Sequence, residues 1–161
     1  MRIWLVTPPT HCGVVESAGT WLPLSLLYLA GELRRRGHEV RVYDAMSLQL
    51  NHAQIREELA LGQPQVVGVG AITASYNDAV EVLKNAKAAC PGVVTVLGGV
   101  DPSFRADEIL EGDGTAVDFI VRGEAERSFA RLVDDLAGGL RASDGLGAAG
   151  RIRGATGPDE A

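Results

Sequence analysis

A run of valines that ends in two glycines is the feature that most restricts what this chain can fold into. Residues 94–102 are Val-Thr-Val-Leu-Gly-Gly-Val-Asp-Pro, an apolar segment without polar alternation that leads into a turn. Such segments are typical of parallel strands covered by helices on both faces. A glycine pair at the end of the strand lets the backbone approach a bulky group closely. Because ligands of open α/β sheets bind at this edge, the segment predicts a small-molecule site.

Strand-like and helix-like segments alternate along the chain as far as residue 138. We expect strands at residues 3–6, 40–43, 65–72, 93–97 and 117–121, with a helix after each of them. Right-handed crossovers place such helices on both faces, so the pattern predicts an α/β fold of the Rossmann-like or flavodoxin-like class, a doubly wound five-stranded parallel sheet. The second strand alternates like an edge strand, and the third is almost wholly apolar like a central one. These patterns predict the strand order 2-1-3-4-5, with its switch point between the first and third strands.

Length and composition set the domain organisation. The 161 residues suffice for one domain with its own core, which we place at residues 1–138. Residues 139–161 are rich in Ala, Gly, Ser and Asp and poor in large apolar side chains, so we expect a flexible linker or disordered tail there.

Charge and cysteine content exclude several classes of partner. The 15 basic and 21 acidic side chains give a net charge of −6, which argues against nucleic acid or an anionic membrane as a partner. No apolar run approaches the roughly 18 residues of a membrane helix, and the N-terminus lacks the pattern of a signal peptide. The two cysteines make no disulfide framework, so we expect a cytoplasmic location.

Four strand ends should meet in one crevice, and each is followed by residues able to contact a ligand. The first strand leads into a long loop that starts with residues 7–13; such loops in compact domains are usually functional or disordered. Residues 73–77 supply hydroxyl groups and an amide beside a helix N-terminus, where free backbone N–H groups gather. Residues 98–99 are the glycine pair. The two carboxylates within residues 122–126 either serve a ligand or favour the start of the last helix.

His11 and the two cysteines need separate interpretation. His11 could be a metal ligand, a base or an ordinary exposed side chain; a ligating histidine usually has a carboxylate partner, and none lies within a few positions. His11 and Cys12 are adjacent and lack the paired spacing of a zinc site. Cys90 falls on the apolar stripe of its helix, which predicts a buried hydrophobe rather than a reactive thiol.

Several familiar signatures are absent. The chain has no phosphate loop of the Gly-x-x-x-x-Gly-Lys-Ser/Thr type and no Gly-x-Ser-x-Gly nucleophile elbow. The Gly68-x-Gly70 pair lies inside a strand rather than in a strand-to-helix turn, which argues against a dinucleotide fingerprint. The residues therefore provide no self-contained catalytic site.

Four segments resemble, in their amino-acid sequence and in their order along the chain, those of a known family. They are residues 21–30 (WLPLSLLYLA) with 36–40 (RGHEV), 66–69 (VVGV) leading to Thr73, 96–104 (VLGGVDPSF), and 117–126 (VDFIVRGEAE). Together they resemble the cobalamin-binding domain of radical S-adenosylmethionine enzymes over roughly residues 1–138. Within that family, residues 11–13 (HCG) and 16–19 (ESAG) are similar to the anaerobic magnesium-protoporphyrin IX monomethyl ester cyclase branch, which serves tetrapyrrole biosynthesis.

The resemblance implies a cobalamin-binding module. It would present the corrinoid at the carboxyl ends of the sheet, for methyl transfer or radical chemistry carried out with a radical S-adenosylmethionine domain or subunit. Carried over by position, the cofactor contacts would come from Thr7, Pro8, Thr10, His11, Gly13, Thr73, Ser75, Tyr76, Gly98, Gly99, Val100, Gly123 and Glu124, with His11 as the candidate cobalt ligand.

Two departures from the family pattern limit that expectation. The Asp-x-His-x-x-Gly motif of methionine-synthase-type domains is absent, because Pro9 stands two residues before His11. This argues against coordination of cobalt by that histidine from below. The Cys-x-x-x-Cys-x-x-Cys motif is also absent, so we expect no iron–sulfur cluster in this chain and no radical chemistry by the chain alone. We expect a fragment, a truncated product or a free-standing module.

Two other functions remain compatible with the residues. One is a stand-alone flavodoxin-like domain that binds another nucleotide, such as a flavin phosphate, through residues 7–13. The other is a sensory or interaction domain whose crevice holds no ligand.

Overall fold

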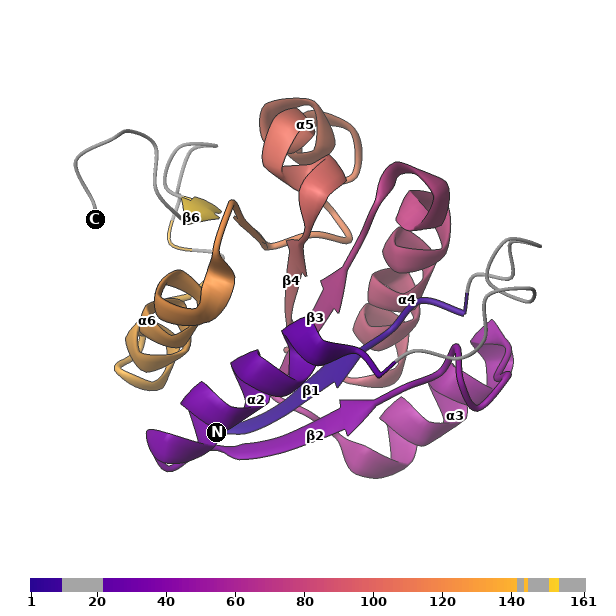
Figure 1. The fold of residues 1–161 in the computed structure, drawn as a ribbon, viewed down its shortest axis with the longest axis horizontal. Helices are drawn as coiled ribbons and strands as arrows, with labels where there is room; N and C mark the ends of the chain where they lie inside the picture. Colours follow the sequence, from indigo (N-terminus) through magenta and orange to yellow (C-terminus); the bar gives the residue numbers. More distant parts are fainter. Residues whose placement is uncertain (10–21, 142–143, 145–150, 154–161) are drawn as a thin grey trace.

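Parallel strands form the centre of the molecule. The computed structural model describes residues 1–9, 22–141, 144 and 151–153 (Figure 1). The strands are β1 (Arg2–Val6), β2 (Glu39–Tyr43), β3 (Val66–Gly70), β4 (Val94–Gly98), β5 (Phe119–Val121) and β6 (Ile152–Arg153). Their order across the sheet is β2-β1-β3-β4-β5-β6, and every neighbouring pair is parallel. The predicted order 2-1-3-4-5 is confirmed, with β2 at one edge and β3 inside the sheet.

Helices cover both faces of the sheet (Figure 1). They are α2 (Leu24–Arg35), α3 (His52–Gly62), α4 (Tyr76–Ala89), α5 (Val100–Gly112) and α6 (Ala125–Ala137), with a 3-10 turn η1 (Thr73–Ser75) before α4. Apolar side chains of α2 and α6 pack on one face, and those of α3, α4 and α5 pack on the other. The two cores explain why the β3 strand is apolar throughout, since both of its faces are covered. No helix in the described part of the chain is long and apolar enough to span a membrane.

Strand β6 departs from the prediction of five strands followed by a tail over residues 139–161. Ile152 and Arg153 pair with Ile120 and Val121 of β5 and so extend the sheet by a sixth, two-residue strand. The guanidinium of Arg151 donates to the backbone carbonyls of Gly114 and Asp118, at 3.0 and 2.7 Å, and also to that of Val117. Two residues carry too little periodicity to predict a strand. The domain boundaries themselves stay a prediction.

The strand register aligns several strand ends at one edge of the sheet. Gly70 at the end of β3 lies opposite Gly98 at the end of β4, and Gly98 lies opposite Val121 at the end of β5. Backbone hydrogen bonding continues past the strands, because the Ala71 N–H donates to the Gly98 carbonyl at 2.8 Å. We refer to this side of the sheet as the carboxyl edge and to the opposite side as the amino edge.

Candidate functional site

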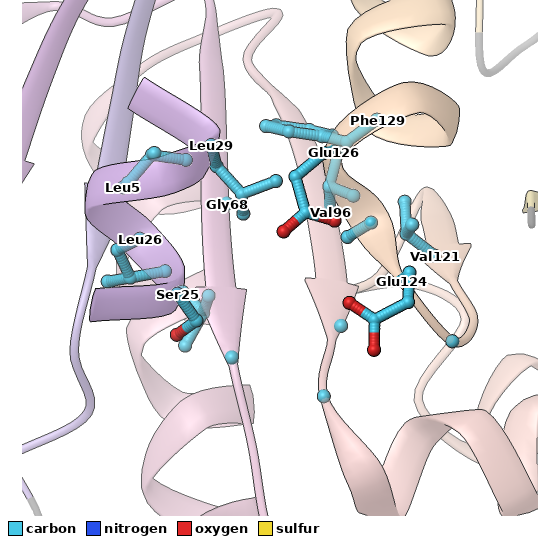
Figure 2. A pocket seen from close by; sticks show the side chains of 16 residues that line it. Leu5, Ser25, Leu26, Leu29, Gly68, Val96, Val121, Glu124, Glu126 and Phe129 are labelled. Carbon is cyan, nitrogen blue, oxygen red and sulfur yellow. The ribbon is translucent and has the colours of Figure 1, made fainter. Parts of the chain in front are cut away.

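Two adjoining hollows open at the carboxyl edge. The first, here called the slot, has a volume of about 160 Å³ and lies between α2 and α6 (Figure 2). The second, here called the cup, has a volume of about 430 Å³ and lies over the ends of β1 and β3, at the predicted switch point. The cup falls within the ordinary size range of small-molecule sites. Both hollows are lined by Ser25, Leu26, Gly70 and Gly99.

Glycines form the floor of the slot for two different reasons. A Cβ atom built on Gly70 would meet nothing within 4 Å, and one built on Gly98 would meet only the Val121 carbonyl, at an ordinary 3.5 Å. Packing therefore does not require glycine at these two positions, and the space above them is free for a ligand. Gly99 differs, since its φ is +101° and a Cβ would lie 2.4 Å from the Ala71 carbonyl oxygen. Its glycine is demanded by the fold itself.

The slot is negatively charged at its α6 side. Figure 2 shows the carboxylates of Glu124 and Glu126 on this side, opposite Leu26 and Leu29 of α2. No lysine or arginine is among the described residues that line the slot. Glu124 is the N-cap residue of α6, yet its side chain makes no capping hydrogen bond, whereas Glu126 lies in the first turn, where the helix dipole favours a carboxylate. The slot can thus accept hydrogen bonds from N–H and O–H groups and repels anions.

The cup offers mainly apolar surface. Its lining includes Thr7, Pro8, Ser75, Gly99 and Val100, five of the residues predicted to bind a cofactor. The hydroxyls of this set are already engaged, which leaves carbon-rich surface toward the cup.

Hydrogen bonds of the two hydroxyls hold the local turns. Thr7 Oγ1 donates to Asp44 Oδ1 at 2.9 Å and accepts from the Met46 N–H at 3.1 Å. Ser75 Oγ accepts from the Ile72 N–H at 3.1 Å and donates to the Ile72 carbonyl at 3.3 Å. These side chains shape the rim of the cup.

Thr73 and Tyr76 line neither hollow. Thr73 Oγ1 donates to Asp101 Oδ1 at 2.9 Å, and the Tyr76 hydroxyl donates to Asp113 Oδ2 at 2.6 Å. Burial, and then the hydrogen bond to Asp113, raises the pKa of the Tyr76 phenol. Both side chains therefore bind acidic residues that follow β4.

Three predicted contacts, Thr10, His11 and Gly13, lie outside the described residues, as does Cys12. Within residues 1–9, 22–141, 144 and 151–153, no group of three or more His, Cys, Asp or Glu side chains gathers to hold a metal ion. Cobalt ligation by His11 stays a prediction. Cys90 is a buried hydrophobe as predicted: it is 2% exposed, its Sγ donates to the Leu59 carbonyl at 3.2 Å, and burial raises its pKa.

Sequence reasoning placed Gly98, Gly99, Gly123 and Glu124 at the slot but missed its other walls. Helix α2 contributes Ser25, Leu26 and Leu29, and α6 contributes Phe129, which periodicity alone assigns to the core. Gly70 was also missed, although a glycine that ends a central strand was a usable signal.

Comparison with known proteins shows the family to which this chain belongs. The family model described as the B12 binding domain matches residues 10–133. The anaerobic magnesium-protoporphyrin IX monomethyl ester cyclase of Rubrivivax gelatinosus is 39% identical over 134 residues, which are 83% of this chain and 24% of that protein. An uncharacterized methyltransferase of Pyrococcus horikoshii is 35% identical over 148 residues, 91% of this chain and 32% of that protein. The chain thus spans about a quarter to a third of these relatives.

A solved structure shares the fold. The cobalamin-dependent S-adenosylmethionine radical enzyme OxsB, with aqua-cobalamin and S-adenosylmethionine bound, superposes with a TM-score of 0.71 at 22% identity. The similarity covers 87% of this chain and 19% of the OxsB chain. The chain belongs to the B12 binding domain family, because the family model matches residues 10–133 and two relatives are 39% and 35% identical.

Proposed function

We propose that this chain binds cobalamin at the carboxyl edge and presents it for methyl transfer or radical chemistry. The observation that carries the proposal is the free space above Gly70 and Gly98, where aligned strand ends leave room that packing does not need. A corrinoid fits the residues present, because a flat macrocycle requires a side-chain-free approach and apolar surface beside it. Bound cobalamin supplies a cobalt centre that carries an alkyl group or accepts and donates electrons.

The hollows suggest a division of contacts. The apolar cup, with Pro8, Ile72 and Val100, suits the hydrocarbon face of the macrocycle. The carboxylates of Glu124 and Glu126 suit the amide N–H groups of corrin side chains and the hydroxyl of the nucleotide tail. Gly70 and Gly99 border both hollows, so one ligand can occupy them together.

A second domain or subunit of the radical S-adenosylmethionine type completes the proposal. Support comes from the structural similarity to OxsB, a cobalamin-dependent S-adenosylmethionine radical enzyme of which this chain spans 19%, and from the presence of only two cysteines in the sequence. The surface of α2 adds a physical argument. Leu24, Leu27 and Tyr28 are 57%, 42% and 66% exposed, while the opposite face of the helix is buried. A helix that is apolar on both faces usually packs against something on each side.

The name of the Rubrivivax gelatinosus relative supports a narrower version, in which the completed enzyme acts in tetrapyrrole biosynthesis. The proposed cytoplasmic location rests on the two cysteines of the sequence. The alternative of a flavin phosphate ligand is disfavoured by the loop after β1, since Pro8 and Pro9 supply no backbone N–H group that could bind a phosphate. No observation favours a sensory domain.

A desalting experiment tests the proposal. The purified chain is mixed with hydroxocobalamin or, in parallel, with flavin mononucleotide, passed through a desalting column, and examined by visible absorbance. We expect corrinoid absorbance to travel with the protein and flavin absorbance to be lost. Retention of the flavin without the corrinoid would contradict the assignment of ligand. A Gly98→Val variant is the matched control, because it fills the free space directly and should retain neither ligand.

A further inference from the structure

We propose that Asp101, through Thr73, is the positioning residue that sets the geometry of the cup before cobalamin binds. The inference rests on the proposed function and adds to it a residue that contacts no ligand itself. Asp101 follows the glycine pair and lies in the first turn of α5. Its side chain is only 4% exposed, so the carboxylate is almost completely removed from water.

The hydrogen bonds of Asp101 join two separate loops of the rim. Oδ1 accepts from the Thr73 hydroxyl at 2.9 Å, and Oδ2 accepts from the guanidinium of Arg105 at 3.1 Å. Thr73 belongs to the loop after β3, and Asp101 to the turn after β4. The first loop supplies Ile72, Ala74 and Ser75 to the cup, and the second supplies Gly99 and Val100.

Arg105 extends this connection to a third element. Its guanidinium lies 5.0 Å from the ring centroid of Tyr76, at the start of α4. The Tyr76 hydroxyl in turn donates to Asp113, beyond the end of α5. Arg105 also marks a kink in α5, with φ −115° and ψ 22°. The turn η1 is therefore tied to the start of α5 through Asp101, and the start of α4 is tied to the middle and the end of α5 through Arg105 and Asp113.

Stability alone is a poor explanation for this arrangement. Burying a carboxylate carries a large desolvation cost, and a buried ion pair is often no better than apolar packing of equal volume. The helix dipole would be satisfied equally by an exposed acidic residue in the first turn. A buried carboxylate that bridges two loops instead selects one distance between them, which is the quantity a rigid macrocycle requires.

Pre-organisation gives the inference a measurable size. A ligand that binds only the competent rim has an apparent Kd equal to its intrinsic Kd divided by the fraction of molecules in that state. Hydrogen bonds to charged groups are among the stronger ones in proteins. We expect loss of the tie to lower the competent fraction, and so raise the apparent Kd, by about tenfold.

Three variants separate positioning from stability. Thr73→Val removes the hydroxyl at an exposed position, so the variant should fold, and Thr73→Ser keeps the hydroxyl. The matched control is Asp118→Asn. Asp118 is also buried, 9% exposed, and accepts from the Thr95 N–H at 2.8 Å, the Thr95 hydroxyl at 3.0 Å and the ammonium of Lys87. It lies just before β5, at the amino edge.

Hydroxocobalamin titrations and thermal unfolding of each full-length variant test the inference. We expect Thr73→Val to raise the Kd about tenfold and to lower Tm, because the buried Asp101 carboxylate loses a hydrogen-bond donor. Thr73→Ser should bind like wild type, and Asp118→Asn should lower Tm without changing the Kd. Amide hydrogen exchange without ligand supplies an independent readout, in which residues 71–76 should exchange faster in Thr73→Val but not in Asp118→Asn.

The outcomes distinguish this inference from the proposed function. If wild type binds cobalamin and Thr73→Val binds equally well, or if Asp118→Asn weakens binding as much as Thr73→Val, the positioning role is wrong and the proposed function stands. If wild type itself retains no cobalamin, the proposed function fails and the positioning role fails with it.

Discussion

Substitution of the two adjacent glycines should have opposite consequences for folding and binding. In Gly98→Ala, the new methyl group meets only the Val121 carbonyl, at 3.5 Å, and otherwise enters the free space of the slot. In Gly99→Ala, the methyl group would lie 2.4 Å from the Ala71 carbonyl oxygen and 2.8 Å from its nitrogen, on a residue whose φ is +101°. The first change is compatible with the fold, and the second is not.

The magnitudes follow from these contacts. The backbone of Gly99, with φ +101° and ψ −173°, lies in a region almost confined to glycine, which costs an L-residue roughly 1–3 kcal/mol. Overpacking adds typically about 1–3 kcal/mol, so Gly99→Ala should lower the free energy of unfolding by roughly 2–6 kcal/mol. Gly98→Ala should change it by less than about 1 kcal/mol, because alanine there meets no strain and restricts the unfolded chain. The same methyl group should raise the Kd for cobalamin by roughly tenfold or more, since it occupies the space proposed for the ligand.

Two assays on the same samples separate the effects. Chemical denaturation gives the free energy of unfolding, and a hydroxocobalamin titration followed by visible absorbance gives the Kd. A Gly98→Ala protein that is stable and binds like wild type would refute the claim that the ligand uses the slot. A Gly99→Ala protein as stable as wild type would refute the packing argument.

Three further predictions concern the scaffold. Gly62→Ala should destabilise the fold by roughly 1–3 kcal/mol, because its Cβ would lie 2.0 Å from the Trp4 ring. Gly31→Ala meets nothing within 4 Å and should stabilise α2 by roughly 0.5–1 kcal/mol. Chemical denaturation shows whether the free energy of unfolding falls in the first variant and rises in the second. The Arg36 guanidinium, and then His38, holds the pKa of Asp134 below its usual range, so the stability it contributes is present above a pH of about 3.9 and is lost as the pH falls further. The Tm of Asp134→Asn should therefore fall less than that of wild type between about pH 7 and about pH 3. An equal fall in Tm would exclude a contribution of the Arg36–Asp134 ion pair to stability. In a Cys12→Ser background, Cys90 should react with Ellman's reagent only after unfolding, because it is buried with a raised pKa; rapid reaction of the folded protein would contradict its burial.

Much of the fold was predictable because the strands are long enough to carry a pattern. The apolar residues of β3 and the mostly apolar residues of β4 predicted buried parallel strands, and the alternation in β2 predicted its place at an edge. Strand β6 was not predictable, since two residues show no periodicity. Their pairing depends on the backbone groups of β5 on the side away from β4. Arg151, which binds carbonyls more than thirty residues away, illustrates the same limit for contacts distant in sequence.

The candidate site was predictable in part. Strand ends and glycines identify the carboxyl edge, so Gly98, Gly99, Gly123 and Glu124 could be named from the sequence. The walls contributed by Leu26, Leu29 and Phe129 could not, because a helix side chain that borders a hollow has the same periodicity as one in the core. The roles of Gly98 and Gly99 also differ only in three dimensions, where one faces open space and the other faces Ala71.

Amide chemical-shift mapping with hydroxocobalamin tests the central claim most directly. In isotope-labelled protein, the account predicts that the perturbed amides cluster at Gly70, Ala71, Gly98, Gly99 and residues 123–126, while Glu39 and Asp118 at the amino edge keep their shifts. Perturbation centred on the amino edge, or shifts spread evenly over the molecule, would contradict binding of the corrinoid at the ends of these strands.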